Sequence, residues 1–237
     1  MDPSPDGKGN RNEREEEEKE AEKGPARLPE QIRELDYKIL RERSRLGLVQ
    51  VYTGNGKGKT TASLGLALRA AGYCYKTAIV QFLKIGYTGE ALAIRKLGEN
   101  VPIRLVSYGK KCVNQAQHDR DFSAGKLESY CKSCFSLDME ADGKFCRAAL
   151  EEGARLAKSG EADVVILDEV NVAVSFGLIS VESVLAAMKG KHPKTELILT
   201  GRNARQEIID AADVVNEVSF LKNPYDQGIF ARKGIEF

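Results

Sequence analysis

A glycine-rich turn with a Gly-Lys-Thr-Thr step is the strongest chemical signal in the sequence. Residues Val49 to Leu64 read VQVYTGNGKGKTTASL, so an apolar strand pattern leads through the turn into a helix pattern. Glycines permit positive φ, and successive N–H groups in such a turn can point at phosphate oxygens beside the positive end of a helix. Lys59 would add a positive charge and the Thr60 hydroxyl a ligand for Mg2+. The segment therefore predicts a phosphate-binding loop of Gly54, Asn55, Gly56, Lys57, Gly58, Lys59, Thr60 and Thr61.

This loop departs from the usual phosphate-loop pattern at one position. The pattern has a glycine five residues before the Gly-Lys step, where this chain has Thr53. A glycine-rich turn that binds no ligand is the alternative, and the agreement of strand, turn and helix argues against it.

Two carboxylates follow an apolar strand pattern further along the chain. Residues Asp163 to Glu169 read DVVILDE, which places Asp168 and Glu169 where a buried strand would end. Carboxylate oxygens at the carboxyl edge of a parallel sheet suit a Mg2+ ion next to bound phosphates. Together with the loop, this segment predicts a site for nucleotide and magnesium.

Four of the five cysteines gather in one part of the sequence. The second and third are separated by two residues, a spacing typical of thiolate sites for Zn2+ or an iron–sulfur cluster. Four unconnected reduced thiols, or a disulfide, are the alternative, and His118 is a further candidate ligand. Cys74 is expected to be a packed free thiol. The candidate metal ligands are Cys112, Cys131, Cys134 and Cys146.

Composition narrows the class of protein. The chain has 237 residues with 36 basic and 35 acidic side chains, and its net charge of +1 gives no broad footprint for nucleic acid. It contains no run of about 20 apolar residues, which a membrane helix would need, and it opens on polar residues instead of a secretory stretch. We expect a cytoplasmic protein that binds neither nucleic acid nor membrane.

The chain is expected to divide into a tail and one domain. Residues 1–26 are mostly charged and have few apolar side chains to bury, which predicts a disordered tail. The domain would cover residues 27–237 and begin with an amphipathic helix over residues 28–45. That helix either packs on its own domain or covers a neighbouring site or a partner subunit. Residues 109–146 form a polar, cysteine-bearing insert after the third strand.

The rest of the domain alternates strand and helix patterns, which predicts a doubly wound, mostly parallel α/β sheet. Together with the phosphate-binding loop, the expectation is a sheet of the P-loop NTPase (RecA-like) type. The expected strands are Gly47 to Tyr52, Thr77 to Leu83, Val101 to Ser107, Asp163 to Leu167, Glu196 to Thr200 and Asp213 to Val218. The expected helices are Thr61 to Ala71, Phe145 to Ser159, Val181 to Met188 and Ala204 to Ala212.

Several separated motifs span most of the chain from Leu46 onward. They are TGNGKGKTTASLGLALRAAG (Thr53 to Gly72), VQF with a following lysine (Val80 to Lys84), GE (Gly89 and Glu90), VVILDEVNVAVSFGLI (Val164 to Ile179), ELILTGRNA (Glu196 to Ala204), ADVVNEV (Ala212 to Val218) and NPYDQGIFARKGIEF (Asn223 to Phe237). This combination resembles the P-loop ATP:corrinoid adenosyltransferases, also called cob(I)alamin or cob(I)yrinic acid a,c-diamide adenosyltransferases.

The resemblance implies transfer of the 5'-deoxyadenosyl group of ATP to the Co(I) centre of a reduced corrinoid, cobalamin or cobyrinic acid diamide, with release of triphosphate. By resemblance, Lys59 stabilises the departing triphosphate, and Thr60 and Glu169 bind Mg2+, with Asp168 as a second candidate. The resemblance also suggests a homodimer, and a flavoprotein is one candidate for the electron donor. Three further residues have two possible roles each. Arg202 either contacts the phosphates or nucleotide or forms a salt bridge within the fold. Gln81 and Lys84 either contact a ligand or stabilise the loop structure.

The expected corrinoid segment departs from the family pattern. Residues Ser107 to Gln115 read SYGKKCVNQ and lack the aromatic pair of the well-known bacterial pattern. Tyr108, Phe122 and Phe135 are candidate replacements. A smaller departure is Lys222-Asn223, where a Lys-His pair is more usual.

Two other functions stay open on the sequence alone. A nucleotide-dependent protein that delivers adenosylcorrinoid to client enzymes would retain its product and turn over little. A P-loop ATPase or kinase with another substrate would release orthophosphate or ADP, or phosphorylate an acceptor.

Overall fold

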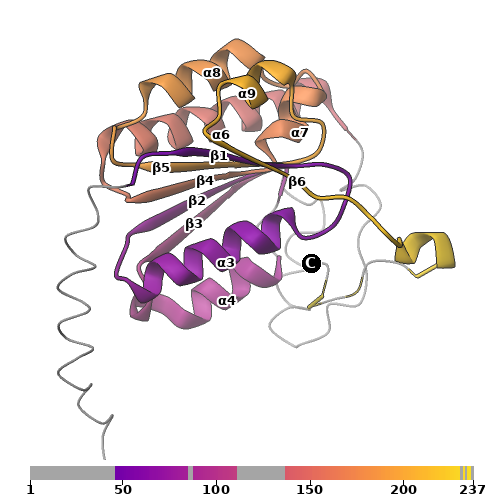
Figure 1. Ribbon diagram of the computed structural model, residues 1–237, viewed down its shortest axis with the longest axis horizontal. Helices are drawn as coiled ribbons and strands as arrows, with labels where there is room; N and C mark the ends of the chain where they lie inside the picture. Colours follow the sequence, from indigo (N-terminus) through magenta and orange to yellow (C-terminus); the bar gives the residue numbers. More distant parts are fainter. Residues whose placement is uncertain (1–45, 85–87, 111–136, 230–231, 233, 236–237) are drawn as a thin grey trace, which may run out of the picture. The chain divides into compact units, whose positions relative to one another are not determined.

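A six-stranded, wholly parallel sheet in the order β3-β2-β4-β5-β1-β6 forms the centre of the fold (Figure 1). The computed structural model describes residues 46–84, 88–110, 137–229, 232 and 234–235. All the elements given below belong to one unit, Glu42–Phe237. The strands are β1 (Val49–Thr53), β2 (Thr77–Phe82), β3 (Ile103–Tyr108), β4 (Val164–Asp168), β5 (Glu196–Thr200) and β6 (Val214–Glu217).

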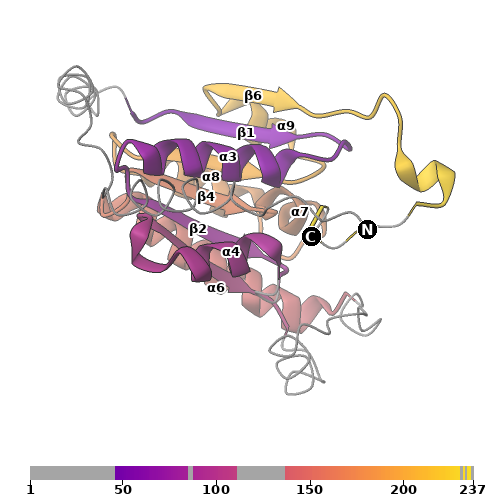
Figure 2. The same cartoon turned by 90° about the horizontal axis from the view of Figure 1, so that it is seen from below.

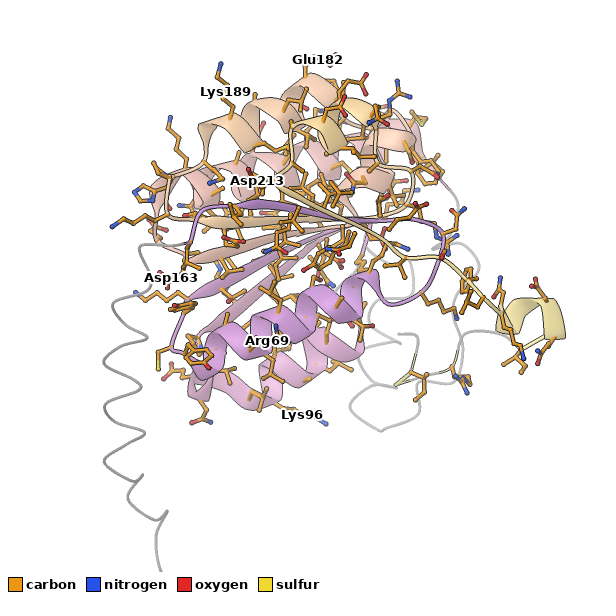
Figure 3. All side chains as sticks on the ribbon, in the orientation of Figure 1. Arg69, Lys96, Asp163, Glu182, Lys189 and Asp213 are labelled. Carbon is orange, nitrogen blue, oxygen red and sulfur yellow. The ribbon has the colours of Figure 1, made fainter. Side chains whose placement is uncertain are left out.

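Helices cover both faces of the sheet. In Figure 1, α3 and α4 lie below the sheet and the other α-helices above it, and Figure 2 shows α3 and α4 in front of the strands. Charged side chains such as Glu182 and Lys189 project from the outer face of α8 (Figure 3). The α-helices are α3 (Lys59–Gly72), α4 (Gly89–Leu97), α6 (Met139–Ser159), α7 (Val170–Ser175), α8 (Val181–Gly190) and α9 (Gln206–Asp210). Short 3-10 helices are η2 (Gly98–Asn100) and η4 (Pro224–Gln227).

The burial of the strands explains their sequences. Every residue of β2, β4 and β5 is buried, as expected for central parallel strands that are covered on both faces. Val80, Leu167 and Leu199 belong to the core between the sheet and α6 to α9, whereas Ile79 and Ile166 face α3 and α4. Successive side chains of a strand point to opposite faces. The apolar runs therefore fill two cores at once.

The predicted fold class is confirmed, and the sheet is entirely parallel rather than mostly so. All six predicted strands occur, with ends shifted slightly, and β5 has the expected bounds. The short helices α4 and α7 were not predicted. No helix among the described residues is both long and apolar enough to cross a bilayer.

The last residues of the predicted cysteine-bearing insert belong to a helix. Residues 139–146 are the first two turns of α6, which begins at Met139 instead of Phe145. Asp138 caps this helix, because its Oδ1 accepts hydrogen bonds from the N–H groups of Glu140 and Ala141 at 3.1 and 3.0 Å. The predicted tail, the predicted N-terminal helix and residues 111–136 of the insert lie outside the described residues.

Candidate active site

The predicted phosphate loop joins β1 to α3 and contacts the chain that follows β6. Gly54 and Gly58 have φ values of 91° and 111°, which residues with a Cβ rarely adopt. The N–H of Gly56 donates to the carbonyl oxygen of Val218 at 2.7 Å. A Cβ at position 56 would lie 2.7 Å from the same oxygen, so glycine is required there. This close approach holds the loop at the carboxyl end of β1.

The ammonium group of Lys59, the first residue of α3, lies within the loop. Its Nζ donates to the carbonyl oxygens of Gly54 at 2.7 Å and of Gly56 at 2.5 Å, and the residue is 6% exposed. Burial lowers the pKa of Lys59; the Glu169 carboxylate opposes this shift and the Arg202 guanidinium adds to it. A partly desolvated positive charge attracts an anion more strongly than one in water. The loop thus combines a buried cation with backbone N–H groups at a helix start.

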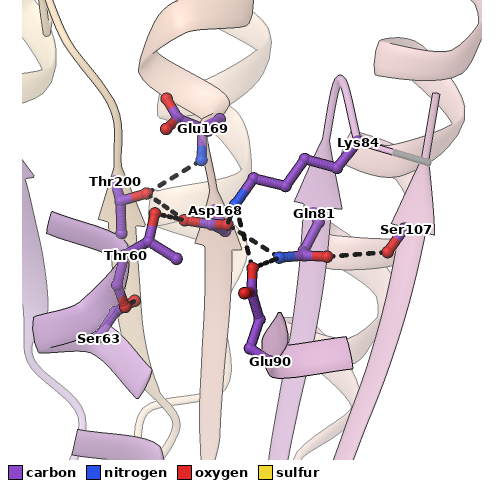
Figure 4. A network of polar contacts seen from close by, with 9 residues as sticks. All are labelled: Thr60, Ser63, Gln81, Lys84, Glu90, Ser107, Asp168, Glu169 and Thr200. Atoms are coloured by element: carbon purple, nitrogen blue, oxygen red, sulfur yellow. Dashed lines mark hydrogen bonds and ion pairs between the residues drawn. The ribbon is translucent and has the colours of Figure 1, made fainter. Parts of the chain in front are cut away.

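Asp168 ends β4, and four side chains donate hydrogen bonds to its carboxylate (Figure 4). Its Oδ1 accepts hydrogen bonds from the hydroxyls of Thr60 and Thr200, both at 2.8 Å. Its Oδ2 accepts from the Lys84 ammonium at 2.6 Å and from the Gln81 amide at 3.2 Å. Burial alone would raise the pKa of Asp168, but the Lys84 charge and the donated hydrogen bonds hold it below its ordinary value. The carboxylate is therefore ionised, although only 1% of the residue is exposed.

The same network continues across β2 to β3 and α4. Gln81 Nε2 donates to Glu90 Oε1 at 2.8 Å, and the Ser107 hydroxyl donates to Gln81 Oε1 at 2.9 Å. Lys84 Nζ lies 3.4 Å from the same oxygen of Glu90. Burial would lower the pKa of Lys84, yet the charges of Asp168 and Glu90 together raise it. A continuous set of polar contacts thus joins the first turn of α3 to the start of α4 (Figure 4).

Glu169 follows Asp168 directly but has a different environment. Its φ is 67°, a left-handed conformation that is uncommon for a residue with a side chain, and its N–H donates to Thr200 Oγ1 at 3.0 Å. Its carboxylate points away from Asp168 (Figure 4) and accepts no hydrogen bond from residues 46–84, 88–110 or 137–229. Burial, together with the Asp168 charge, raises its pKa. The second acid therefore has free oxygen lone pairs next to the loop.

The structure thus brings most of the predicted site residues to one edge of the sheet. Thr60, Gln81 and Lys84 all donate hydrogen bonds to Asp168. Arg202 is exposed, and its charge helps to lower the pKa of Lys59. Asn55 and Thr61 are exposed positions of the loop and the first turn of α3, and Lys57 is half-buried. The sequence reasoning missed Glu90, Ser107 and Thr200, although two of them, Glu90 and Thr200, lie in quoted motifs.

Known protein sequences resemble this chain over most of its length. The family model "ATP:corrinoid adenosyltransferase BtuR/CobO/CobP" matches residues 45–237. A corrinoid adenosyltransferase of Pseudomonas aeruginosa is 32% identical over 204 residues, which cover 86% of this chain and 90% of that protein. The chain belongs to the ATP:corrinoid adenosyltransferase family.

Other relatives and one solved structure add to the comparison. The corrinoid adenosyltransferase CobA of Salmonella typhimurium is 28% identical, with 86% of this chain and 92% of that protein covered. A corrinoid adenosyltransferase of a Sinorhizobium species is 32% identical, with coverage of 81% and 80%. The flagellar accessory protein FlaH of Methanocaldococcus jannaschii matches 72% of this chain and 70% of its own, at a TM-score of 0.40 and 13% identity, which supports no argument.

The donor groups of this adenosyltransferase fit a magnesium ion. The Thr60 hydroxyl donates its one hydrogen bond to Asp168, which leaves the oxygen lone pairs for a cation. Glu169 offers a carboxylate that no described residue occupies, and hard divalent cations prefer such oxygens. Thr60 and Glu169 are thus suited to be ligands, whereas Asp168 already accepts hydrogen bonds on both oxygens.

The environment of Cys146 does not fit its predicted role as a metal ligand. Cys146 lies in α6, is 0% exposed and belongs to the apolar core. Without a metal, burial and the Asp142 charge raise the pKa of its thiol to about 12, so the thiol is protonated in this apolar setting. Cys146 is therefore better explained as a packed thiol. Cys112, Cys131, Cys134 and His118 lie outside the described residues.

Of the three aromatic residues expected near the corrinoid, only Tyr108 is described. It ends β3 and packs against the core that includes α6, while its neighbour Ser107 bonds Gln81 on the opposite face. Phe122 and Phe135 lie outside the described residues.

Proposed function

We propose that this chain transfers the 5'-deoxyadenosyl group of ATP to the cobalt of a reduced corrinoid and releases triphosphate. Family membership over residues 45–237 is the observation that carries this proposal. The Co(I) centre supplies an electron pair to C5' of ATP, the cobalt–carbon bond forms, and the bond from C5' to the triphosphate oxygen breaks. Because cobalt is the nucleophile, the protein needs no nucleophilic side chain; its tasks are positioning and charge stabilisation.

The phosphate loop supports this reaction by stabilising the leaving group. Lys59 and the N–H groups of the loop would face the negative charge that collects on the triphosphate as the bond breaks. In the structure, Lys59 Nζ donates hydrogen bonds to two carbonyl oxygens of the loop. Bound phosphate would replace these with stronger hydrogen bonds between the ammonium group and charged phosphate oxygens.

Magnesium is part of the proposal and would be held by Thr60 and Glu169. When bound, the ion would neutralise phosphate charge and orient the triphosphate. Asp168 would position Thr60 by accepting the hydrogen bond of its hydroxyl, which measures 2.8 Å. Of the two acids, Glu169 would thus be the ligand of the ion and Asp168 a positioning residue.

The decisive experiment is an anaerobic incubation of the full chain with Mg-ATP and chemically reduced cobalamin. We expect adenosylcobalamin in the visible spectrum and an equal amount of triphosphate by ion-exchange chromatography, over many turnovers. Orthophosphate or ADP with an unchanged corrinoid would overturn the proposal. A single turnover with retained product would favour the delivery function instead.

Family membership also leads us to expect a homodimer and a separate electron donor such as a flavoprotein. Light scattering of the full chain should then give about twice the 26.0 kDa of one chain. A monomer mass would refute the dimer without affecting the reaction.

A further inference from the structure

The backbone at Lys84 is held in place from two sides. Leu83, which precedes it, has a φ of 59°, a left-handed conformation that costs free energy for a residue with a Cβ. Gly109 lies against Lys84, and a Cβ at Gly109 would be 2.7 Å from the carbonyl oxygen of Lys84. Strain of this kind persists where the surrounding structure fixes the residue, and it often accompanies function. The fold therefore holds Lys84 where its side chain reaches Asp168 at the carboxyl end of β4.

The ammonium group of Lys84 lies between two carboxylates. It is 2.6 Å from Oδ2 of Asp168 and 3.4 Å from Oε1 of Glu90. Among the ion pairs of the described residues, the contact with Lys84 is the one that Asp168 makes. Figure 4 shows Lys84 reaching Asp168 from the side opposite to Thr60 and Thr200.

We propose that Lys84 is a built-in counter-cation, which takes the position at Asp168 that a divalent cation would otherwise occupy. The proposal deepens the proposed function and rests on it for the identity of the cation. Asp168 has two oxygens and accepts two hydrogen bonds on each, so a metal ion could bind it only by displacing a donor. Lys84 thereby keeps Asp168 as the acceptor that orients Thr60, and it leaves Glu169 as the carboxylate for the metal.

Loss of the Lys84 charge has a defined consequence in this arrangement. Asp168 and Glu90 would remain as partly or fully buried carboxylates without a cation, which is unfavourable. A free divalent cation can compensate them, so the variant should acquire a cation site at Asp168 in addition to the ligands that Thr60 and Glu169 offer in the normal chain.

The test measures Mn2+ binding to the nucleotide-free full chain by electron paramagnetic resonance. Lys84→Met should bind Mn2+ at least about tenfold more tightly than the normal chain, since a unit charge a few ångströms away acts strongly in a partly buried site. Lys84→Arg keeps the charge and should behave as the normal chain does. Lys189→Met removes an equal charge from the exposed face of α8 and should change nothing.

A second variant identifies the new ligand. In Lys84→Met with Asp168→Asn, the gain in Mn2+ affinity should disappear. The proposal is overturned if folded Lys84→Met binds Mn2+ no more tightly than the normal chain, or if the gain survives Asp168→Asn. Should Lys84→Met fail to fold even with Mn2+, Lys84→Gln, which keeps a hydrogen-bond donor without charge, takes its place.

A thermal measurement gives an independent readout. Mg2+ should raise the melting temperature of Lys84→Met by several degrees more than that of Lys189→Met; an equal response would count against the proposal. Neither measurement uses ATP or corrinoid. A failed adenosyl-transfer assay would refute the proposed function, whereas the cation measurements decide the role of Lys84.

Discussion

Replacement of Gly56 by alanine tests whether the phosphate loop is held against the segment after β6. The new Cβ would lie 2.7 Å from the carbonyl oxygen of Val218 and 2.8 Å from the carbonyl carbon of Ser219. Both are backbone atoms, so no flexible side chain can move aside. The loop or the segment after β6 has to shift, and the hydrogen bond from Gly56 N–H to Val218 would be lost or stretched.

The size of the effect follows from two contributions. Overpacking of a close contact costs about 1–3 kcal/mol, and a lost backbone hydrogen bond costs about 0.5–1.5 kcal/mol. The free energy of unfolding of Gly56→Ala should therefore fall by roughly 2–4 kcal/mol. In a domain of this size each kcal/mol lowers the melting temperature by about 2–4 °C, so we expect a decrease of roughly 5–15 °C.

Differential scanning calorimetry of the nucleotide-free chain measures this decrease, and two other glycines provide controls. Gly65 lies within α3 and a Cβ there meets nothing within 4 Å, so Gly65→Ala should stabilise the chain by about 0.5–1 kcal/mol. Gly58 also has open space but a φ of 111°, so Gly58→Ala should cost about 1–3 kcal/mol through strain alone. If Gly56→Ala melts at or above the temperature of the normal chain, the close contact with Val218 does not exist.

Three further predictions concern the chemistry. Lys59→Ala should lower kcat for adenosyl transfer by about 10²–10³-fold, measured from the cobalamin spectrum; unchanged transfer would refute its assigned role. Glu169 has a raised pKa, so its contribution to stability is present below about pH 4.5 and is lost as pH rises through the raised pKa. Glu169→Gln without nucleotide should thus melt above the normal chain at about pH 7 and together with it at about pH 4; no difference at pH 7 would contradict the raised pKa. Cys131→Ser with Cys134→Ser should abolish bound zinc or iron in elemental analysis, whereas Cys146→Ala should retain it; a metal-free normal chain would end the metal hypothesis.

The central strands β2, β4 and β5 were predictable because burial on both faces requires a nearly continuous apolar run. The segment Val164–Asp168 shows this: it has no alternation, only apolar residues and then an acid, and every position is buried. The helix α7 (Val170–Ser175) was missed for a physical reason. Its sequence VNVAVS is rich in β-branched residues, which favour strands, but Val170, Ala173 and Val174 are buried in the core, and tertiary packing overrides the local preference.

The phosphate loop was predictable from sequence because its parts are consecutive residues, whereas the network around Asp168 depends on strand order. Asp168 and Gln81 meet because β4 pairs with β2 in a register that places these residues opposite each other. Thr200 reaches Asp168 because β5 lies between β4 and β1. No spacing in the sequence encodes these neighbours. Glu90, Ser107 and Thr200 therefore lay in motifs or at the ends of predicted strands, but no role was predicted for them.

The different roles of the two adjacent acids follow from the geometry at the end of β4. Asp168 is the last strand residue, and its side chain lies on the face of α3, where Thr60 donates to it. Continued as a strand, the chain would turn Glu169 to the opposite face of the sheet, towards the core below α6. The left-handed φ of 67° at Glu169 breaks that alternation and ends the strand. The strain at Glu169 thus keeps a second carboxylate next to the loop. Without it, Asp168 would have to accept the hydrogen bond of Thr60 and also bind the proposed magnesium ion.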